Sequence, residues 1–492
     1  MTAQDVITQD ALFIGGQWVK PESDATIEVV SPSTEEVVGR VPAPSAADVD
    51  RAVRAAREAF DRGPWPRMSP AERAAVMHRI ADGLEARADE MARIVTTENG
   101  TPIKLSGPAQ VHGAIPRLRY YADLAERFTF DELREGKRVR AALLKEPVGV
   151  VAAITPWNGP LALALIKLGP ALAAGCTFVL KPPPETPLVF TVLAEVCEQA
   201  GLPEGVVSIL AGDRETGQQL VAHPGVDKVS FTGSSAAGQA IMAECARRIK
   251  RVSLELGGKS AAIILDDADP ATAVQQLLPM ATMLTGQMCL LKSRVLVPRS
   301  RQAELVEAFC EGVRALKVGD PFDSDTYYGP LIAKRQRDRV EGYIEAGRAE
   351  GAHLVMGGGR PAHLPKGWYV EPTVFTGVDN SMRIAREEIF GPVTSFLAYD
   401  DVDEAVEIAN DTDFGLAGSV YTGDPARGFA VARRVRAGTY GVNCYDNDPS
   451  VPFGGYKQSG LGREGGPEGL EEYLETKAVS LPAGFSPFPS ST

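Results

Sequence analysis

The chain is poor in the side chains that build most metal and disulfide centres. It has 6 cysteines and 5 histidines among 492 residues. The cysteines stand at 176, 197, 245, 289, 310 and 444 without a CxxC pair, and the histidines at 78, 112, 223, 353 and 363 without ligand spacing. This excludes a disulfide framework, so we expect reduced thiols, and we predict no metal site.

Positive charge and long apolar runs are also scarce. The 51 Lys and Arg against 64 Asp and Glu give a formal net charge of −13, which argues against a broad nucleic-acid or anionic-lipid surface. The most apolar stretch, 161–180, is interrupted by Lys167 and a Gly-Pro pair, so a buried helix followed by a strand is expected there. The N-terminus lacks the basic and apolar parts of a secretory signal. We expect a cytoplasmic protein with no membrane anchor and no nucleic-acid partner.

What the chain does have is enough apolar side chains, 44% of its residues, for a large core. Short β-like runs fill the first 45 residues, and helical patterns follow at 46–60 and 69–94. Apolar β runs then alternate with helical patterns, which predicts a parallel sheet with helices on both faces. The strands are expected at 148–154, 177–181, 206–210, 228–231, 252–256 and 260–264, and the helices at 160–174, 187–200, 216–222 and 236–250.

The second half repeats this alternation more loosely. Strands are expected at 294–298 and 394–399, and helices at 301–316, 332–350 and 402–409. Two segments fit neither pattern: a charged β-like run at 128–145, and an apolar, proline-rich tail after Lys477. Neither can bury itself alone, so we predict that both pair with another subunit.

Cys289 follows Gly286, Gln287 and Met288, between a helix-like run and the β run at 294–298. A single cysteine is usually a small buried apolar side chain. A position between a glycine turn and a strand also suits a nucleophilic thiol. By itself the residue leaves both interpretations open.

Glu255 lies in an apolar β pattern that ends at Gly257 and Gly258. A solvated carboxylate is out of place there. The residue is either structurally paired or held partly desolvated with a raised pKa, as a general base requires. The sequence alone does not separate these two interpretations.

Two turns directly follow predicted strands. Asn158 comes after the strand at 148–154, where α/β proteins place ligands and where an amide can donate to a developing oxyanion, although a turn asparagine is also common. Gly233 and Ser234 follow the strand at 228–231 and open a helix. Such a turn lets backbone N–H groups approach a phosphate, but it lacks the GxGxxG pattern and is a weak signal alone.

Together and in this order, the four motifs resemble those of the aldehyde dehydrogenase superfamily, over nearly the whole chain. Further family-like segments are 181–187, 387–393 (EEIFGPV) and 452–464 (PFGGYKQSGLGRE). The resemblance implies an α/β fold with a Rossmann-like dinucleotide-binding domain at 1–127 and 147–256 and an α/β catalytic domain at 257–476. It also implies a small β oligomerisation arm at 128–146 and 477–492, and a homodimer or homotetramer.

The resemblance also implies roles for residues. Cys289 is the nucleophile, Asn158 binds the oxyanion, and Glu255 activates the hydrolytic water, while Lys167 and Glu464 match supporting polar positions of the active site. Hydride passes to a nicotinamide cofactor, and the aldehyde becomes a carboxylic acid. The cofactor-binding positions implied are Thr155, Pro156, Trp157, Lys181, Glu185, Gly212, Gly217, Phe231, Gly233, Ser234, Leu256, Glu388 and Phe390.

One departure concerns the choice of cofactor. Family members often carry a glutamate three residues after Lys181, where it binds the ribose hydroxyls and repels a 2′-phosphate. Here that position is Pro184, and Glu185 follows it. Loss of the carboxylate would admit NADP, whereas an inward-turned Glu185 would restore the preference for NAD. We favour NAD.

The substrate tunnel is predicted only by analogy. Positions that are often aromatic in related enzymes for small aldehydes are here Gly159, Leu163, Ile166 and Met283, while Phe453 keeps its ring. With Met288 and Leu290 beside the nucleophile, these residues predict a roomy, apolar mouth for medium or bulky hydrophobic aldehydes.

Three alternatives have different chemistry. A CoA-acylating semialdehyde dehydrogenase would use the same cysteine, but the presence of Glu255 favours hydrolysis by water. A catalytically retired binding protein is disfavoured by the intact Cys289, Asn158 and Glu255. A Cys–His hydrolase is disfavoured because no histidine stands near Cys289 in the sequence.

Overall fold

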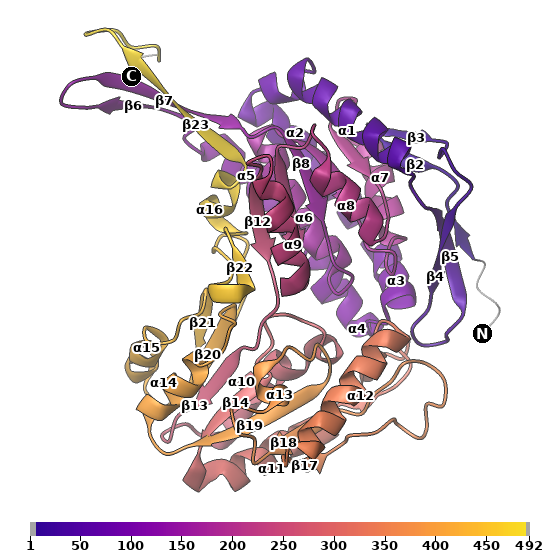
Figure 1. Cartoon of the computed structure of the whole chain (residues 1–492), viewed down its shortest axis with the longest axis vertical. Helices are drawn as coiled ribbons and strands as arrows, with labels where there is room; N and C mark the ends of the chain where they lie inside the picture. The colour runs from indigo at the N-terminus through magenta and orange to yellow at the C-terminus, as the bar shows by residue number, and fades with distance from the viewer. Residues whose placement is uncertain (1–5, 489–492) are drawn as a thin grey trace.

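Two large sheets, one above the other in Figure 1, organise the residues that the computed structural model describes, 6–488. The upper sheet has eight strands in the order β22-β12-β11-β8-β9-β10-β2-β3. Strands β8 to β12 of this sheet are parallel to one another, as predicted. The bounds are β2 (Leu12–Ile14), β3 (Gln17–Val19), β8 (Val150–Ile154), β9 (Thr177–Lys181), β10 (Val207–Ile209), β11 (Lys228–Thr232), β12 (Arg251–Glu255) and β22 (Gly460–Leu461).

Helices cover both faces of this sheet because its strands are apolar on both sides. In β8, Val151 and Ala153 face one helical layer, and the alternate residues Val150, Ala152 and Ile154 face the other. The first layer holds α2 (Pro70–Ala86), α3 (Ala88–Asn99), α5 (Ile115–Arg127), α6 (Pro160–Ala174) and α7 (Val189–Gln199), and the second holds α1 (Ala46–Asp61), α8 (Arg214–Ala222) and α9 (Ser235–Ala246).

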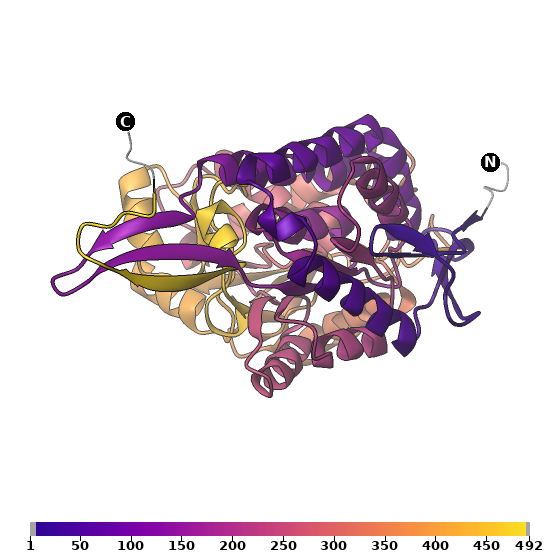
Figure 2. The same cartoon turned by 90° about the horizontal axis from the view of Figure 1, so that it is seen from above.

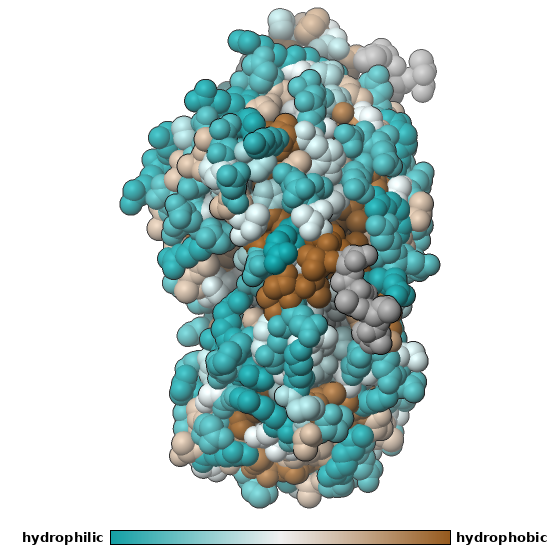
Figure 3. Space-filling view, turned by 90° about the vertical axis from the view of Figure 1, so that its right-hand side faces the viewer, coloured by the Kyte–Doolittle hydropathy of each residue, from teal (hydrophilic) through white to brown (hydrophobic). Residues whose placement is uncertain are grey.

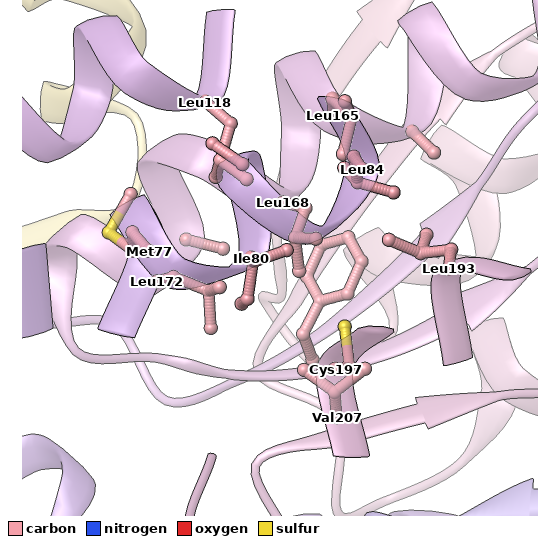
Figure 4. Close-up of a cluster of buried hydrophobic side chains, with 14 of the residues drawn as sticks. Met77, Ile80, Leu84, Leu118, Leu165, Leu168, Leu172, Leu193, Cys197 and Val207 are labelled. Carbon is pink, nitrogen blue, oxygen red and sulfur yellow. The ribbon is translucent and has the colours of Figure 1, made fainter. Parts of the chain in front are cut away.

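The first layer forms the largest apolar cluster of the described residues. Figure 4 shows Leu165, Leu168 and Leu172 of α6 among side chains from the neighbouring helices, including Ile80 of α2 and Leu193 of α7. Full burial of one such side chain contributes about 1.5–3 kcal/mol. The helix-then-strand interpretation of 161–180 is confirmed by α6 and β9.

Two predicted helices differ from the observed ones. The segment 69–94 was expected to be one helix, but the chain breaks at Arg87 (φ −113°, ψ 17°) into α2 and α3. No glycine or proline marks the break, and the apolar spacing continues through it. The helix expected at 236–250 ends at Ala246, and Ile249 then takes a left-handed backbone (φ 56°) with its side chain in solvent.

The lower sheet has seven strands in the order β17-β18-β19-β14-β13-β20-β21, all parallel except β17. The strands expected at 260–264, 294–298 and 394–399 are confirmed; the others were not predicted. The bounds are β13 (Ala261–Ile264), β14 (Arg294–Pro298), β17 (His353–Met356), β18 (Thr373–Thr376), β19 (Val393–Tyr399), β20 (Ala417–Tyr421) and β21 (Thr439–Val442). Helices α10 (Pro270–Thr282) and α11 (Gln302–Arg314) cover one face, and α12 (Lys334–Ala349), α13 (Arg383–Arg386), α14 (Val402–Asn410) and α15 (Pro425–Ala432) the other.

The chain crosses between the two sheets twice. It leaves the upper sheet after β12 and enters the lower one at β13. It returns late, because β22 pairs with the free edge of β12 and α16 (Gly466–Glu471) packs on α6. The returning segment lies within 257–476, the range predicted for the catalytic domain, but it packs on the upper sheet. The division of the chain into domains stays a prediction.

The two segments that fitted neither layer meet in a projecting arm. Strands β6 (Asp131–Glu135) and β7 (Arg140–Pro147) form a hairpin, and β23 (Leu474–Leu481) pairs antiparallel with β7 along its whole length. Figures 1 and 2 show this three-stranded sheet extending away from both lobes. The segments thus pair with each other; pairing with a second subunit stays a prediction.

At the other end of the molecule, β1 (Ile7–Thr8), β4 (Thr26–Val30) and β5 (Val37–Pro42) form a small sheet of their own. Figure 3 shows the face on this side, which is mostly hydrophilic with apolar side chains gathered near its middle. Between residues 6 and 488, no helix combines the length and the apolar character needed to cross a membrane.

Candidate active site

The candidate site lies at the carboxyl edge of the upper sheet. The chain passes from β8 to β9 and β10 on one side, and then to β11 and β12 on the other, so β8 and β11 flank a topological switch point. Loops that follow adjacent parallel strands meet at such an edge, which is where open α/β sheets bind ligands. Asn158 follows β8, Ser234 follows β11, and Leu256 follows β12.

A cavity of about 730 Å³ opens between this edge and the lower sheet. Ten of the predicted site residues line it: Pro156, Trp157, Asn158, Gly233, Ser234, Leu256, Cys289, Glu388, Phe390 and Glu464. Eight others do not: Thr155, Lys167, Lys181, Glu185, Gly212, Gly217, Phe231 and Glu255. The tunnel positions Gly159, Leu163, Ile166, Met283, Met288, Leu290 and Phe453 are also on its wall.

Cys289 is presented by a strained turn between α10 and β14. Leu284 and Thr285 both have left-handed backbones, with φ of 51° and 56°, and Gly286 follows with φ of 77°. A left-handed conformation is costly for a β-branched residue such as Thr285, and strain of this kind concentrates at functional sites. Gln287 holds the turn, because its side-chain oxygen accepts from the Ile332 N–H at 3.0 Å.

Asn158 lies against the same turn. Its amide nitrogen donates to the Gln287 carbonyl at 2.9 Å, which fixes the amide and leaves its second N–H available. Burial, together with the nearby carboxyl groups of Glu388 and Glu255, raises the pKa of the Cys289 thiol above its usual range. The thiol is therefore protonated at neutral pH in this arrangement, and a reaction at its sulfur would require loss of that proton.

Glu255 ends β12 and is buried, with neither carboxyl oxygen hydrogen-bonded within the described part of the chain. Burial raises its pKa well above the usual value, and the charge of Glu464 raises it further. Glu464 forms a buried ion pair with Lys167 of α6. The three side chains thus form one polar group in an otherwise apolar interior, and of the two interpretations open for Glu255 the desolvated one agrees with this environment.

Aromatic and small residues shape the cleft for a flat ligand. The Trp157 and Phe390 rings meet edge to face, with centroids 5.3 Å apart. A Cβ atom on Gly233 would come within 2.4 Å of the Phe231 ring, so only glycine fits there. Ser234 caps α9 by accepting from the Ala237 N–H at 3.3 Å, which leaves a helix N-terminus at the cavity. Glu388 accepts from the Gly258 N–H at 2.9 Å.

Lys181 lies farther along the same edge. Its ammonium donates to the carbonyls of Pro182 at 2.9 Å and Gly212 at 2.6 Å, and burial lowers its pKa to about 8. A Cβ atom on Gly217 would touch the Lys181 side chain, and the Thr155 N–H donates to the Lys181 carbonyl at 3.3 Å. The sequence left the direction of Glu185 open; its carboxylate forms an ion pair with Arg335 of α12.

Several residues that the sequence did not indicate fix these loops. Asn99 donates to the Trp157 carbonyl at 2.7 Å, and Gln110 to the Asn158 carbonyl at 2.9 Å. Gln336 donates to the Phe390 carbonyl at 2.8 Å, and Arg339 to that of Glu388 at 2.6 Å. All four act on backbone groups of the predicted motifs and lie far from them in the sequence, so no spacing pattern could have indicated them.

No group of three or more His, Cys, Asp or Glu side chains within 6–488 is arranged to hold a metal ion. None of the five histidines lines this cavity. His78, His112 and His223 contact Asp123, Glu85 and Asp50 respectively. His363 contacts the Val318 carbonyl, and His353 begins β17. Cys289 and Glu255 therefore remain the candidate reactive groups of this site.

Known proteins resemble this chain over nearly its full length. Geranial dehydrogenase of Castellaniella defragrans is 48% identical over 477 residues, which cover 96% of this chain and 99% of that protein. A 3-succinoylsemialdehyde-pyridine dehydrogenase of a Pseudomonas species is 45% identical over 473 residues, covering 95% and 97%.

Solved structures agree with this. Mycobacterium tuberculosis aldehyde dehydrogenase, complexed with NAD+, matches with a TM-score of 0.97 at 49% identity and covers 98% of this chain and 100% of that chain. A cysteine-to-alanine mutant of aldehyde dehydrogenase C from Pseudomonas syringae, complexed with NAD+ and octanal, matches with a TM-score of 0.95 at 44% identity, covering 99% and 100%.

The predicted fold and resemblance are thus confirmed. A model of the aldehyde dehydrogenase family matches residues 18–479, and each of the relatives and structures above covers at least 95% of the chain. The chain belongs to the aldehyde dehydrogenase family, and the enzyme that it forms oxidises aldehydes.

Proposed function

We propose that the enzyme oxidises a hydrophobic aldehyde to its carboxylic acid through a covalent intermediate on Cys289. The sulfur attacks the aldehyde carbon, and the thiol proton leaves to a nearby base. The resulting oxyanion accepts hydrogen bonds from the free Asn158 N–H and the Cys289 backbone N–H. The observation that carries this proposal is the position of Cys289 on the cavity wall, beside the fixed Asn158 amide.

The second half of the reaction resolves the thioester, which remains once a hydride has left the aldehyde carbon for the cofactor described below. Glu255 takes a proton from water, the hydroxide adds to the thioester carbon, and the C–S bond breaks to release the acid and the Cys289 sulfur. Two free oxygens on a buried carboxyl group suit this role, and the Lys167–Glu464 pair beside it tunes its pKa. A CoA-acylating reaction would not need this carboxylate.

The cleft fits a nicotinamide dinucleotide, which when bound supplies the hydride acceptor for the reaction. Gly233 and the N-terminus of α9 offer room and backbone N–H groups to a pyrophosphate. Glu388 and Phe390, held by Arg339 and Gln336, line the same cavity as Cys289. Lys181 lies at the adjoining strand end, as expected for the adenosine side, and the solved relatives above bind NAD+.

The apolar walls support a hydrophobic substrate, and so do relatives that act on geranial or bind octanal. Each buried CH2 group contributes about 0.8 kcal/mol. We therefore expect kcat/KM for octanal or geranial to exceed that for acetaldehyde by about 100-fold or more. Reduced dinucleotide formation across an aldehyde series measures this. An equal or higher kcat/KM for acetaldehyde would refute the hydrophobic preference.

The preference for NAD+ is proposed to depend on Glu185. Its carboxylate acts electrostatically on Lys181 and neutralises Arg335. In Glu185→Ala, a freed Arg335 guanidinium would attract a 2′-phosphate that the carboxylate repels. We expect the ratio of kcat/KM for NADP+ to that for NAD+ to rise about 10-fold. Glu341→Ala, which releases Arg360 from another surface ion pair on α12, is the matched control. An unchanged ratio in Glu185→Ala contradicts this assignment.

We also propose a cytoplasmic homodimer or homotetramer assembled through the arm. The outer edges of β6 and β23 have no strand beside them within 6–488, and Val139, Val479 and Phe485 are exposed there. An exposed edge of this kind readily pairs with another chain. The scarcity of cysteine and the absence of a disulfide pattern support a reducing compartment.

A further inference from the structure

Arg117 is a cation on the wall of the same cavity for which the proposed reaction has no use. It lies in the first turn of α5, beside Gly113 and Pro116, which also line the cavity. The other arginine on the wall, Arg339, donates to backbone carbonyls and to Tyr343. In contrast, Nε and Nη1 of Arg117 are buried without a hydrogen-bond partner among residues 6–488.

The fold gains little from this arrangement. Burial lowers the pKa of Arg117, yet a guanidinium stays charged in proteins. A positive side chain in the first turn of a helix also opposes the helix dipole. Unpaired buried donors are costly and are rarely retained without a partner. A group that enters the cavity and accepts hydrogen bonds would compensate for this cost.

The charges around Arg117 restrict what that group can be. The carboxylates of Glu464, Asp446 and Asp448 act on Arg117 electrostatically. Each has another partner: Glu464 binds Lys167, Asp446 accepts from the Asn447 N–H, and Asp448 accepts from Ser450. Among residues 6–488, Arg117 is therefore the arginine on this wall without a hydrogen-bond partner, and the carboxylates around it disfavour a substrate that carries a negative charge of its own.

We propose that Arg117 hydrogen-bonds an uncharged oxygen, such as that of a ketone, on the tail of the aldehyde while the reacting end is at Cys289. This inference rests on the proposed function and narrows its substrate class to hydrophobic aldehydes with one oxygen acceptor along the tail. The rest of the wall, including Leu163, Ile166 and Met283, contacts the apolar part. Arg117 is then a specificity determinant and takes no part in bond making.

The test uses nonanal, its oxo derivatives with one CH2 replaced by C=O at successive tail positions, and the aldehyde-acid of equal length. The full-length wild type is compared with Arg117→Met and with Arg119→Met. Arg119 is the matched control because it lies two residues along α5 and pairs with Asp82. We expect one tail position at which Arg117→Met lowers the kcat/KM of the ketone relative to nonanal by about 10-fold, mainly through a higher KM for the ketone. Arg119→Met should leave this ratio unchanged.

If the kcat/KM of each ketone relative to nonanal is the same in Arg117→Met as in the wild type, the inference is overturned. It is also overturned if the wild type has a higher kcat/KM for the aldehyde-acid, relative to nonanal, than for any of the ketones. If Arg117→Met does not fold, Arg117→Lys keeps the charge but loses the planar fork, and a smaller fall at the same position is expected. If the wild type oxidises nonanal but Arg117→Met does not change the ketone-to-nonanal ratio of kcat/KM, this inference is refuted while the proposed function stands. No oxidation of any aldehyde by the wild type would refute both.

Discussion

Cys289→Ala is expected to lose aldehyde oxidation almost completely, by about 10⁴-fold or more in kcat/KM. The Cys289 thiol lines the same cavity as the fixed Asn158 amide, and water cannot replace it in forming a thioester. Measurement of reduced dinucleotide formation with octanal gives the rate, and equilibrium binding of NAD+ to the same variant establishes that the cleft remains intact. We expect NAD+ binding to change by less than about 3-fold, because the side chain that is lost is small.

The matched control is Cys444→Ala. Cys444 is exposed, whereas Cys176, Cys197, Cys245 and Cys310 are buried. The control should keep the wild-type rate and should leave one cysteine that reacts with iodoacetamide, faster as the pH is raised, and that is protected by the aldehyde. If Cys289→Ala retains more than a small fraction of the activity, or if Cys444→Ala loses it, Cys289 is not the nucleophile.

Glu255→Gln is expected to slow the steady-state rate by about 10²–10⁴-fold while leaving the first turnover largely intact. The carboxylate is needed to activate water, which happens after the dinucleotide has been reduced. Rapid mixing of the variant with octanal and NAD+ should therefore show a burst of about one reduced dinucleotide per active site, followed by slow turnover. Glu475→Gln, at an exposed pair with Arg251, should keep the wild-type behaviour.

The pH profile adds a second readout. Because burial raises the pKa of Glu255, its carboxyl group is protonated and inactive as a base below that pKa. The wild-type steady-state rate should rise with pH and level off above the raised pKa, and the variant should lose this rise. A variant that loses the burst together with the steady state would show that Glu255 acts before the thioester forms, as the acceptor of the Cys289 proton.

The sequence indicates the candidate reactive residues because each lies at the end of, or close to, a strand whose pattern is readable. Cys289, Glu255 and Asn158 all border apolar β runs, and the parallel sheet then brings Asn158 and Glu255 to one edge. The break at Arg87 was not predictable, since neither composition nor spacing changes there. The contact of Gln110 with the Asn158 carbonyl was not predictable either. Residues Ser106–His112 form a π-helix, whose i to i+5 hydrogen bonds do not produce the 3.6-residue spacing by which an α-helix is recognised in a sequence.

Arg117 shows another limit of sequence reasoning. An arginine at the start of an amphipathic helix is normally a solvated side chain, and nothing in its neighbourhood along the chain distinguishes it. Its isolation becomes apparent only when α5 is packed beside α6 and the loop that carries Asp446 and Asp448. The charged groups around Arg117 come from distant segments, so the tunnel, predicted to be roomy and apolar, has apolar side chains on its wall together with Arg117, Asp446 and Asp448.

The return of the chain to the upper sheet has a mechanical consequence. Glu255 is the last residue before the first crossing, and it pairs in register with Gly460 at the end of the second. A hinge motion that separated the lobes would pull on both crossings at once and would displace the carboxylate. The two crossings therefore restrain the lobes from moving apart. We expect aldehyde and acid to exchange through movement of the loops at the cavity mouth, while the lobes stay closed throughout turnover.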